Sequence, residues 1–272
     1  KEINTAFPKG KVIAIMGQNG SGKTTLVKHL NGLYKPTDGD VRYNGQSTLK
    51  KTVAQISRNI ILVFQHPEHM LFEQSVTQEI TFCARMQQVP FTDEQVSEVL
   101  EKYGLSEDAE TFPINLSMGK KHLLTILSVL FSSADVVILD EPTLGMDLHI
   151  KQQLEEIIAF LKEQGKTVIM ITHRMANAEH ADQVVVLEHG KSVETGTHAE
   201  LMAAGGVYAK LFTTQAVKSF SFCSTTRISF ISSLGGTDAS YLSADTSMKT
   251  CSVSGANSSA GLSTVSAGIS VF

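Results

Sequence analysis

Eight consecutive residues near the start of the chain have the types and spacing of a phosphate-binding loop. The run Gly17 to Thr24 reads GQNGSGKT and fits the pattern G-x-x-x-x-G-K-[ST], between an apolar stretch and a helix-like stretch. Glycines let successive backbone N–H groups point at one anion, and the lysine and hydroxyl that follow can reach phosphate and Mg²⁺. A fortuitous glycine-rich turn is the alternative, but the strand–loop–helix context favours a nucleoside triphosphate. The predicted nucleotide-binding residues are Gly17, Gln18, Asn19, Gly20, Ser21, Gly22, Lys23, Thr24 and Thr25.

Two adjacent carboxylates follow a second apolar run. Val136 to Leu139 reads VVIL and leads directly into Asp140 and Glu141. In a parallel sheet the ligands gather at the carboxyl ends of the strands, where the phosphate loop also lies. We therefore predict that Asp140 and Thr24 hold Mg²⁺ and that Glu141 accepts a proton from the attacking water. Taken alone, such a pair is as often a helix cap or a turn.

Four further features stand at suitable points along the chain. Gln65 follows the apolar run at 60–64 and is predicted to sense the metal or the water, and His173 follows the run at 167–171 and is predicted to touch the γ-phosphate. Ser117 begins a helical pattern, where backbone amides favour an anion, and Asp147 follows Glu141 by a short turn. Each feature alone is weak, because Ser117 also fits a plain N-cap and a strand-end histidine is usually an ordinary polar residue.

The elements that must position these residues alternate along the chain. Apolar runs typical of buried strands lie at 11–16, 60–64, 135–139, 167–171 and 183–187. Helical patterns lie at 22–31, 76–87, 93–103, 117–131 and 148–163. This order predicts an α/β fold, a phosphate-loop NTPase core with a mostly parallel sheet and a helical insertion at about 65–116.

Composition divides the chain near residue 217 and limits its partners. Residues 1–217 are expected to form one ATP-binding domain, and residues 218–272 are rich in Ser, Thr and Gly and are predicted to be a disordered or artefactual tail. The net charge of −4 gives no support to a nucleic-acid partner. No apolar run approaches the ~20 residues that span a bilayer, and three cysteines without metal-ligand spacing suit a reduced, cytosolic chain.

The ordered set of motifs resembles the nucleotide-binding subunit of an ABC transporter over about residues 3–215. Gly17–Thr24 matches its Walker A motif, Val136–Asp140 its Walker B motif, and Leu116–Lys120, reading LSMGK, its signature. Gln65, Glu141, Asp147 and His173 match the Q-loop, the following glutamate, the D-loop and the switch histidine. The resemblance implies MgATP hydrolysis by two such subunits that sandwich two ATP molecules. It also implies that Ser117, Gly119 and Asp147 face the nucleotide of the partner subunit.

A finer resemblance follows Gln65. The run FQHPEHMLFEQSVTQEITF is similar to the energy-coupling-factor importers, which take up vitamins and metal ions, through Pro67, Glu68, Phe72, Val76 and Glu79. It implies that region 65–82 receives a coupling helix from a polytopic membrane subunit. The chain would then lie at the cytoplasmic face of the membrane as a peripheral protein. The alternative for Met70 to Phe72 is plain core packing.

The chain also departs from the family pattern. Lys120 stands where the signature usually has glutamine, and Leu123 takes a commonly basic position. The contact between this signature and the ATP held by the partner subunit can therefore be altered. Only 16 residues precede Gly17, which leaves no room for the usual adenine-stacking aromatic and suggests a truncated N-terminus. Two alternatives therefore stay open, namely a non-transport ABC-type ATPase of translation or DNA repair, and a weakly active regulatory subunit.

Overall fold

The structure is a computed structural model that describes residues 3–173, 178–214 and 268–271. The chain divides into two compact units, residues 1–212 with 266–272, and residues 213–265. The first of these units contains the predicted phosphate loop Gly17–Thr24. The predicted domain boundary at 217 and most of the predicted tail lie outside the described residues.

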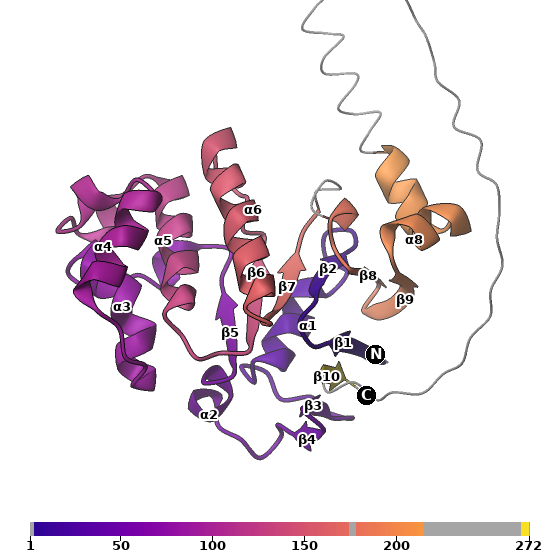
Figure 1. Ribbon diagram of the computed structural model, residues 1–272. Helices are drawn as coiled ribbons and strands as arrows, with labels where there is room; N and C mark the ends of the chain where they lie inside the picture. Colours follow the sequence, from indigo (N-terminus) through magenta and orange to yellow (C-terminus); the bar gives the residue numbers. More distant parts are fainter. Residues whose placement is uncertain (1–2, 174–177, 215–267, 272) are drawn as a thin grey trace, which may run out of the picture. The chain divides into compact units, whose positions relative to one another are not determined.

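A six-stranded sheet with the strand order β5-β6-β7-β2-β8-β9 forms the centre of this unit (Figure 1). Its first five strands in that order run parallel and β9 pairs antiparallel with β8. Every residue of β5, β6, β7 and β2 is buried, as expected for parallel strands that are covered on both faces. The bounds are β2 Val12–Met16, β5 Ile60–Val63, β6 Val136–Asp140, β7 Thr167–Ile171, β8 Gln183–Glu188 and β9 Lys191–Gly196. The predicted mostly parallel α/β core is confirmed.

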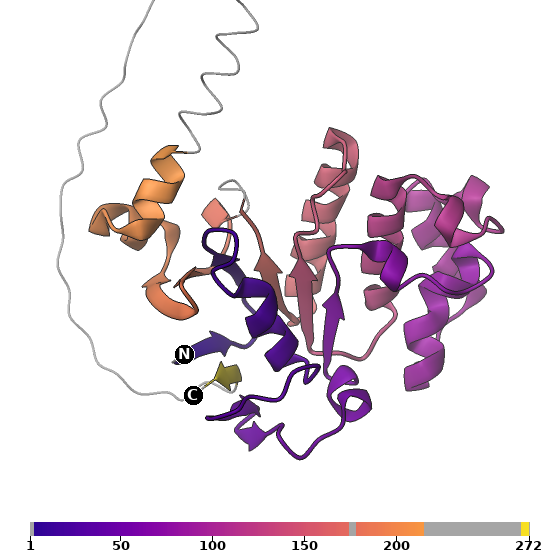
Figure 2. The ribbon, with the colours of Figure 1, turned by 180° about the vertical axis from the view of Figure 1, so that it is seen from behind.

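Alternate residues of each strand belong to two hydrophobic clusters, one on each face of the sheet. In β2, Val12 and Ala14 pack in one cluster with helices α5 (Met118–Leu130) and α6 (Leu148–Glu163). Ile13 and Ile15 pack in the other cluster with α1 (Lys23–Leu30). Figure 2 shows the face that carries α1. This period of two fixes which strand residues point toward which helices.

The helical insertion predicted at about 65–116 is present. It consists of η1 (Pro67–His69), α3 (Val76–Gln87), α4 (Asp93–Lys102), η2 (Ser106–Asp108) and η3 (Pro113–Asn115). Figures 1 and 2 both show α3 and α4 grouped with α5 at the β5 side of the sheet. Ser75 caps α3, and Thr92 with Gln95 forms a capping box on α4, so side-chain oxygens satisfy the first amides of both helices.

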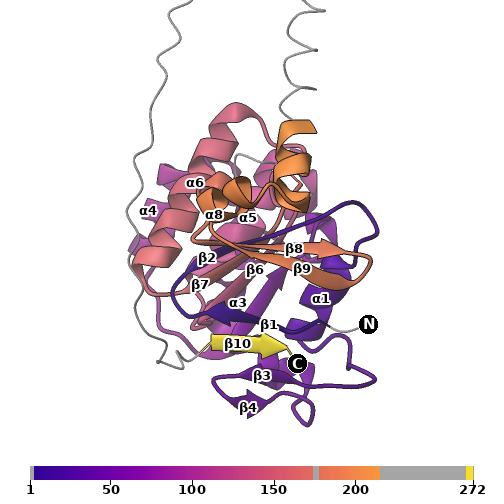
Figure 3. The same ribbon diagram turned by 90° about the vertical axis from the view of Figure 1, so that its right-hand side faces the viewer.

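A second, antiparallel sheet has the strand order β1-β10-β3-β4 and was not predicted (Figure 3). Its strands are β1 Thr5–Pro8, β3 Val41–Tyr43, β4 Gln46–Ser47 and β10 Gly268–Val271, and helix α2 (Val53–Ser57) follows β4. The four residues of β10 lie in the segment 218–272 that composition predicts to be a tail. They pair through main-chain bonds on both sides, and Ile269 is buried in the cluster that contains Phe7 and Val41. Composition alone does not reveal such a pairing.

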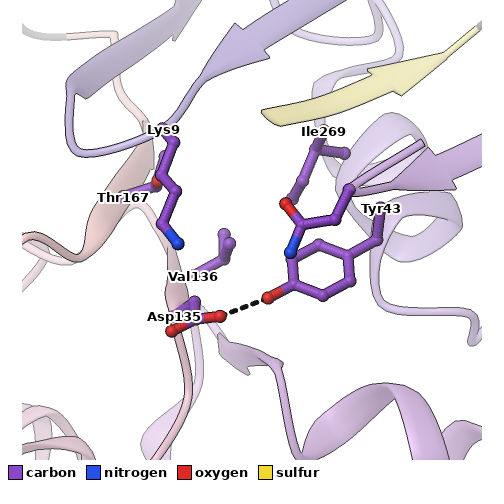
Figure 4. A pocket seen from close by; sticks show the side chains of 7 residues that line it. Lys9, Tyr43, Asp135, Val136, Thr167 and Ile269 are labelled. Atoms are coloured by element: carbon purple, nitrogen blue, oxygen red, sulfur yellow. Dashed lines mark hydrogen bonds between the residues drawn. The ribbon is translucent and has the colours of Figure 1, made fainter. Parts of the chain in front are cut away.

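A side-chain contact joins the two sheets at the edge where β6 begins. The Tyr43 hydroxyl donates a hydrogen bond to the Asp135 carboxylate, beside a cavity of about 10 Å³ that Lys9 and Ile269 also line (Figure 4). Burial and this bond raise the pKa of the Tyr43 hydroxyl above its usual range. The contact fixes the amino end of β6, whose other end carries Asp140 and Glu141.

Helix α8 (His198–Ala204) follows β9 and begins with a capping box formed by Thr197 and Glu200. Within residues 3–173, 178–214 and 268–271, no helix combines the length and apolar character needed to cross a bilayer.

Candidate nucleotide-binding site

The loop after β2 is held in a conformation that only glycine adopts easily. Gly17, Gly20 and Gly22 have φ angles of 147°, 79° and 101°. A Cβ at Gly17 would lie 2.2 Å from the Leu187 carbonyl oxygen, so the loop passes too close to β8 for any side chain there. The sequence pattern thus has a direct steric cause.

Lys23 lies inside this loop and braces it. Its Nζ donates to the carbonyl oxygens of Gly17 at 2.9 Å and Gln18 at 3.0 Å. Burial lowers the pKa of the Lys23 amine, and the nearby carboxylates of Glu141 and Asp140 act in the opposite direction. The backbone N–H groups of the loop and the amine therefore concentrate positive potential at the start of α1, as an anion site requires.

Asp140 ends β6 as a nearly buried carboxylate with 3% exposure. Among the described residues its Oδ1 has no hydrogen-bond partner. Burial raises the pKa of Asp140, a hydrogen bond with the Thr24 side chain opposes that shift, and the charge of Glu141 adds to it. An unpartnered buried carboxylate oxygen next to a threonine hydroxyl is a donor set that fits Mg²⁺. The predicted pairing of Asp140 with Thr24 fits this arrangement.

Glu141 has a left-handed backbone, with φ of 50°, which is uncommon for a residue with a side chain. Its N–H donates to the Ile171 carbonyl oxygen at 3.1 Å, so the turn is anchored on the neighbouring strand β7. Its carboxylate Oε2 lies 2.5 Å from Nδ1 of His173. A strained backbone at such a position is consistent with a functional constraint on where the carboxylate points. The structure thus joins two residues that are 32 positions apart in sequence.

The phosphate loop and Glu141 border one pocket of about 410 Å³ at the carboxyl ends of the strands, and Asp140 is not among its lining residues. Gln65, which follows β5, lines it together with Glu141, which follows β6. The remaining lining residues are Asn19, Gly20, Gly22, Lys23, Thr24, Thr25 and Ile171. His173 reaches the site through its contact with Glu141. Sequence reasoning did not single out Ile171, because a strand-end isoleucine reads as core.

Ser117, Gly119 and Asp147 gather elsewhere and are not among the residues that line this pocket. Ser117 caps α5 by accepting from the Lys120 N–H at 3.4 Å, and Asp147 caps α6 by accepting from the Ile150 N–H at 2.9 Å. A Cβ at Gly119 would lie 2.7 Å from the Ile150 Cδ1, so the signature helix packs closely on the start of α6.

Lys120, the residue that departs from the family signature, forms an ion pair with Asp108. Its Nζ lies 2.6 Å from Asp108 Oδ2. The pair links the first turn of α5 to the end of η2, and both side chains are partly exposed. In this structure the Lys120 charge is therefore partnered within its own chain.

The fold and the site together define a phosphate-loop ATPase domain. Residues 1–144 match the family described as ABC transporter. The chain is 37% identical to the energy-coupling factor transporter ATP-binding protein EcfA2 of Staphylococcus saprophyticus, over 71% of each chain. The chain belongs to the ABC transporter family of ATP-binding proteins.

Two further comparisons extend this likeness. The structure of CbiO1 from Clostridium perfringens, described as part of the ABC transporter complex CbiONQ, superposes with a TM-score of 0.64 at 30% identity and covers 75% of this chain and 83% of that one. A putative ABC transporter ATP-binding protein of Caldanaerobacter subterraneus is 40% identical over 70% of this chain. The chain spans only 34% of that relative, and 39% of a putative ABC transporter ATP-binding protein from Methanosarcina acetivorans.

Proposed function

We propose that this chain is the ATP-hydrolysing motor subunit of an energy-coupling-factor type importer. The observation that carries the proposal is the convergence of the phosphate loop, Gln65 and Glu141 on one pocket, with the buried Asp140 next to Glu141 at the end of β6. The likeness to EcfA2 and CbiO1 supports the importer type. The solute class would be a vitamin or a metal ion, recognised by membrane subunits.

The reaction is in-line attack of water on the γ-phosphate of ATP, and the residues have separate tasks. Lys23 and the loop amides bind the phosphates and stabilise developing charge. Glu141 accepts the proton of the attacking water. His173 contacts the Glu141 carboxylate and positions it relative to the γ-phosphate. Asp140, Thr24 and Gln65 would hold Mg²⁺, and the ion would neutralise charge on the phosphate oxygens.

A second ABC ATPase subunit, identical or related, completes each site. Ser117, Gly119 and Asp147 lie away from the pocket of their own chain, at the junction of α5 and α6. We assign this junction to the nucleotide held by the partner subunit. The first turn of α5 then supplies its amides and the positive end of its dipole to that phosphate.

The surface for the membrane subunit is the segment 65–82 of the helical insertion. Phe72 is 58% exposed and its ring packs edge-on against Phe82, with ring centroids 4.5 Å apart. Exposed aromatic residues of this kind are typical of a protein-binding surface.

Polar contacts connect this surface to the backbone beside Phe72 and to the signature helix. Glu79 is buried and accepts the N–H groups of Phe72 at 3.0 Å and Glu73 at 2.9 Å. Glu68 pairs with Lys121 of the signature helix at 2.7 Å. A partner that docks here is therefore linked by direct contacts to α5 and its signature residues.

Affinity capture from the host's gently solubilised membranes tests the proposal. We expect the native chain to recover a polytopic membrane subunit and a second ATPase, and Phe72→Ala to recover at least tenfold less of the membrane subunit. Phe160→Ala, which alters a 45% exposed aromatic on α6, serves as the matched control and should recover native amounts. Recovery of ribosomes or DNA-repair proteins without a membrane subunit would overturn the importer assignment and leave the ATPase assignment intact.

A further inference from the structure

The turn between β8 and β9 contacts the phosphate loop directly. The Gly190 N–H donates to the Ser21 carbonyl oxygen at 2.9 Å, and a Cβ at Gly22 would lie 3.6 Å from the Gly190 Cα. In β8, which leads into this turn, the Leu187 carbonyl oxygen faces Gly17 at the other end of the loop. Gly190 is buried although it stands in a hairpin turn. The loop is thus supported from behind by a segment some 170 residues later in the chain.

This contact fixes the orientation of one peptide plane in the loop. The chain has no cis peptide bond among the described residues, so the carbonyl of Ser21 and the N–H of Gly22 point in opposite directions. Because the carbonyl is bonded to Gly190, the Gly22 N–H points away from the turn. Gly22 lines the pocket and precedes the first residue of α1. Its N–H belongs to the set of amides that form an anion nest.

We propose that Gly190 is a positioning residue for phosphate binding, which acts through the Ser21 carbonyl to hold the Gly22 N–H toward the nucleotide. The proposal rests on the assignment of Gly17–Thr24 as the phosphate site. It assigns the β8–β9 turn, which lines no part of the pocket, a role in ATP affinity and none in the chemical step.

The chain contains a matched control turn. His189 and Gly190 have φ angles of 49° and 76°, and Asn44 and Gly45 in the β3–β4 turn have φ angles of 49° and 77°. Both pairs have the two consecutive left-handed residues of a type I′ hairpin turn. Alanine at either glycine meets the same backbone strain. The β3–β4 turn has no contact with the phosphate loop in the described contacts, so Gly45→Ala controls for backbone strain in such a turn. Gly190 is buried and Gly45 is exposed, so the hydrogen bond to Ser21 itself is tested by a change in the backbone.

The test measures MgATP affinity and thermal unfolding for Gly190→Ala, Gly45→Ala and Lys23→Ala. We expect Gly190→Ala to weaken MgATP binding at least tenfold and Gly45→Ala to change it less than twofold, with similar falls in melting temperature. In the assembled complex, Gly190→Ala should raise the KM for ATP and leave kcat at saturating ATP within twofold. Equal affinities of the two alanine variants would overturn the role of Gly190. Native affinity in Lys23→Ala would instead overturn the phosphate-site assignment.

A backbone change separates the hydrogen bond from the shape of the turn. Glycolic acid in place of Gly190, introduced by translation with an α-hydroxy acid, replaces the N–H with an ester oxygen and adds no side chain. The same ester at Gly45 is the control. Weaker MgATP binding with the ester at 190 alone supports the proposal even where Gly190→Ala fails to fold. Unchanged binding with the ester at 190 contradicts it.

Discussion

At the scale of single residues, Asp140 shows a conflict between stability and function. Its carboxylate is nearly buried, its Oδ1 lacks a partner among the described residues, and burial raises its pKa above the ordinary value of 3.8. Between the ordinary and the raised pKa the folded chain binds more protons than the unfolded chain. Stability therefore falls as pH rises through that window, and the charged form is disfavoured above it.

We predict that Asp140→Asn stabilises the nucleotide-free chain at pH 7. Removing this disfavoured buried charge should raise the melting temperature. The gain in stability should vanish below pH 3.8, because the Asp140 carboxyl is then neutral in both the folded and the unfolded chain. The same variant should lose the extra stability that Mg²⁺ adds to ATP binding. Thermal scans at pH 7 and pH 3, with and without MgATP, check both parts, and a lower melting temperature at pH 7 would contradict the burial argument.

The functional residues were found from sequence to different extents. Gly17 to Thr24 carry a spacing that has a steric and electrostatic cause, so the loop was predictable. The contact of His173 with Glu141 depends on the adjacency of β6 and β7, which no local pattern encodes. Gly190 was missed because its only local signal, the pair His-Gly after the apolar run at 183–187, predicts a turn and not the loop that the turn touches.

At the scale of elements, α5 is a helix buried along most of its length. His122 on it is 1% exposed, and its Nδ1 has no partner among the described residues. Burial lowers the pKa of His122 from 6.5 to about 4, with a smaller contribution from His66. Between pH 6.5 and 4 the unfolded chain takes up a proton that the folded chain does not, so stability falls on acidification through this window.

We predict that His122→Leu removes this acid sensitivity. At 1.36 kcal/mol for each pKa unit, the free energy of unfolding of the native chain should fall by on the order of 3 kcal/mol between pH 7 and pH 4 because of His122. The free energy of unfolding of the leucine variant should fall correspondingly less between pH 7 and pH 4. The variant also lacks the buried nitrogen that has no hydrogen-bond partner. Urea unfolding at several pH values measures the difference. Parallel pH profiles for the two chains would show that His122 is not the group responsible.

The long elements were predictable and the short ones were not. Continuous apolar runs gave the parallel strands, and helical spacing gave α3, α4, α5 and α6 close to their observed bounds. The strands β1, β3 and β4 are two to four residues long, too short for any period to stand out. They exist because β10 and neighbouring strands supply main-chain partners, and β-strand formation depends on such context.

At the scale of the whole molecule, the site residues fall into two groups on one chain. The phosphate loop, Gln65 and Glu141 share a pocket, and Asp140 directly precedes Glu141 in the chain. Ser117, Gly119 and Asp147 gather at the α5–α6 junction. If the second group serves a partner's nucleotide, ATP must bring two chains together. The two chains would then approach when ATP binds and separate after hydrolysis, and this change could move an attached membrane subunit.

We predict that Ser117→Arg abolishes ATP-dependent pairing and leaves ATP binding to the single chain within twofold of native. The arginine is large at an exposed helix start, so it blocks the partner and not the pocket of its own chain. Analytical ultracentrifugation with MgATP in the Glu141→Gln background, where turnover is suppressed, gives the readout. If the arginine variant still pairs in the presence of MgATP, the α5–α6 junction is not part of the interface between the two chains.

The central claim is that Glu141 activates water in an ATP-hydrolysing motor. The most direct test measures, side by side, MgATP affinity and hydrolysis for the native chain and Glu141→Gln in the assembled complex. We predict that hydrolysis falls by ~10²–10⁴-fold while affinity stays within twofold, because the amide keeps the shape of the carboxylate and cannot accept the proton. Hydrolysis at the native rate in Glu141→Gln would contradict the assignment.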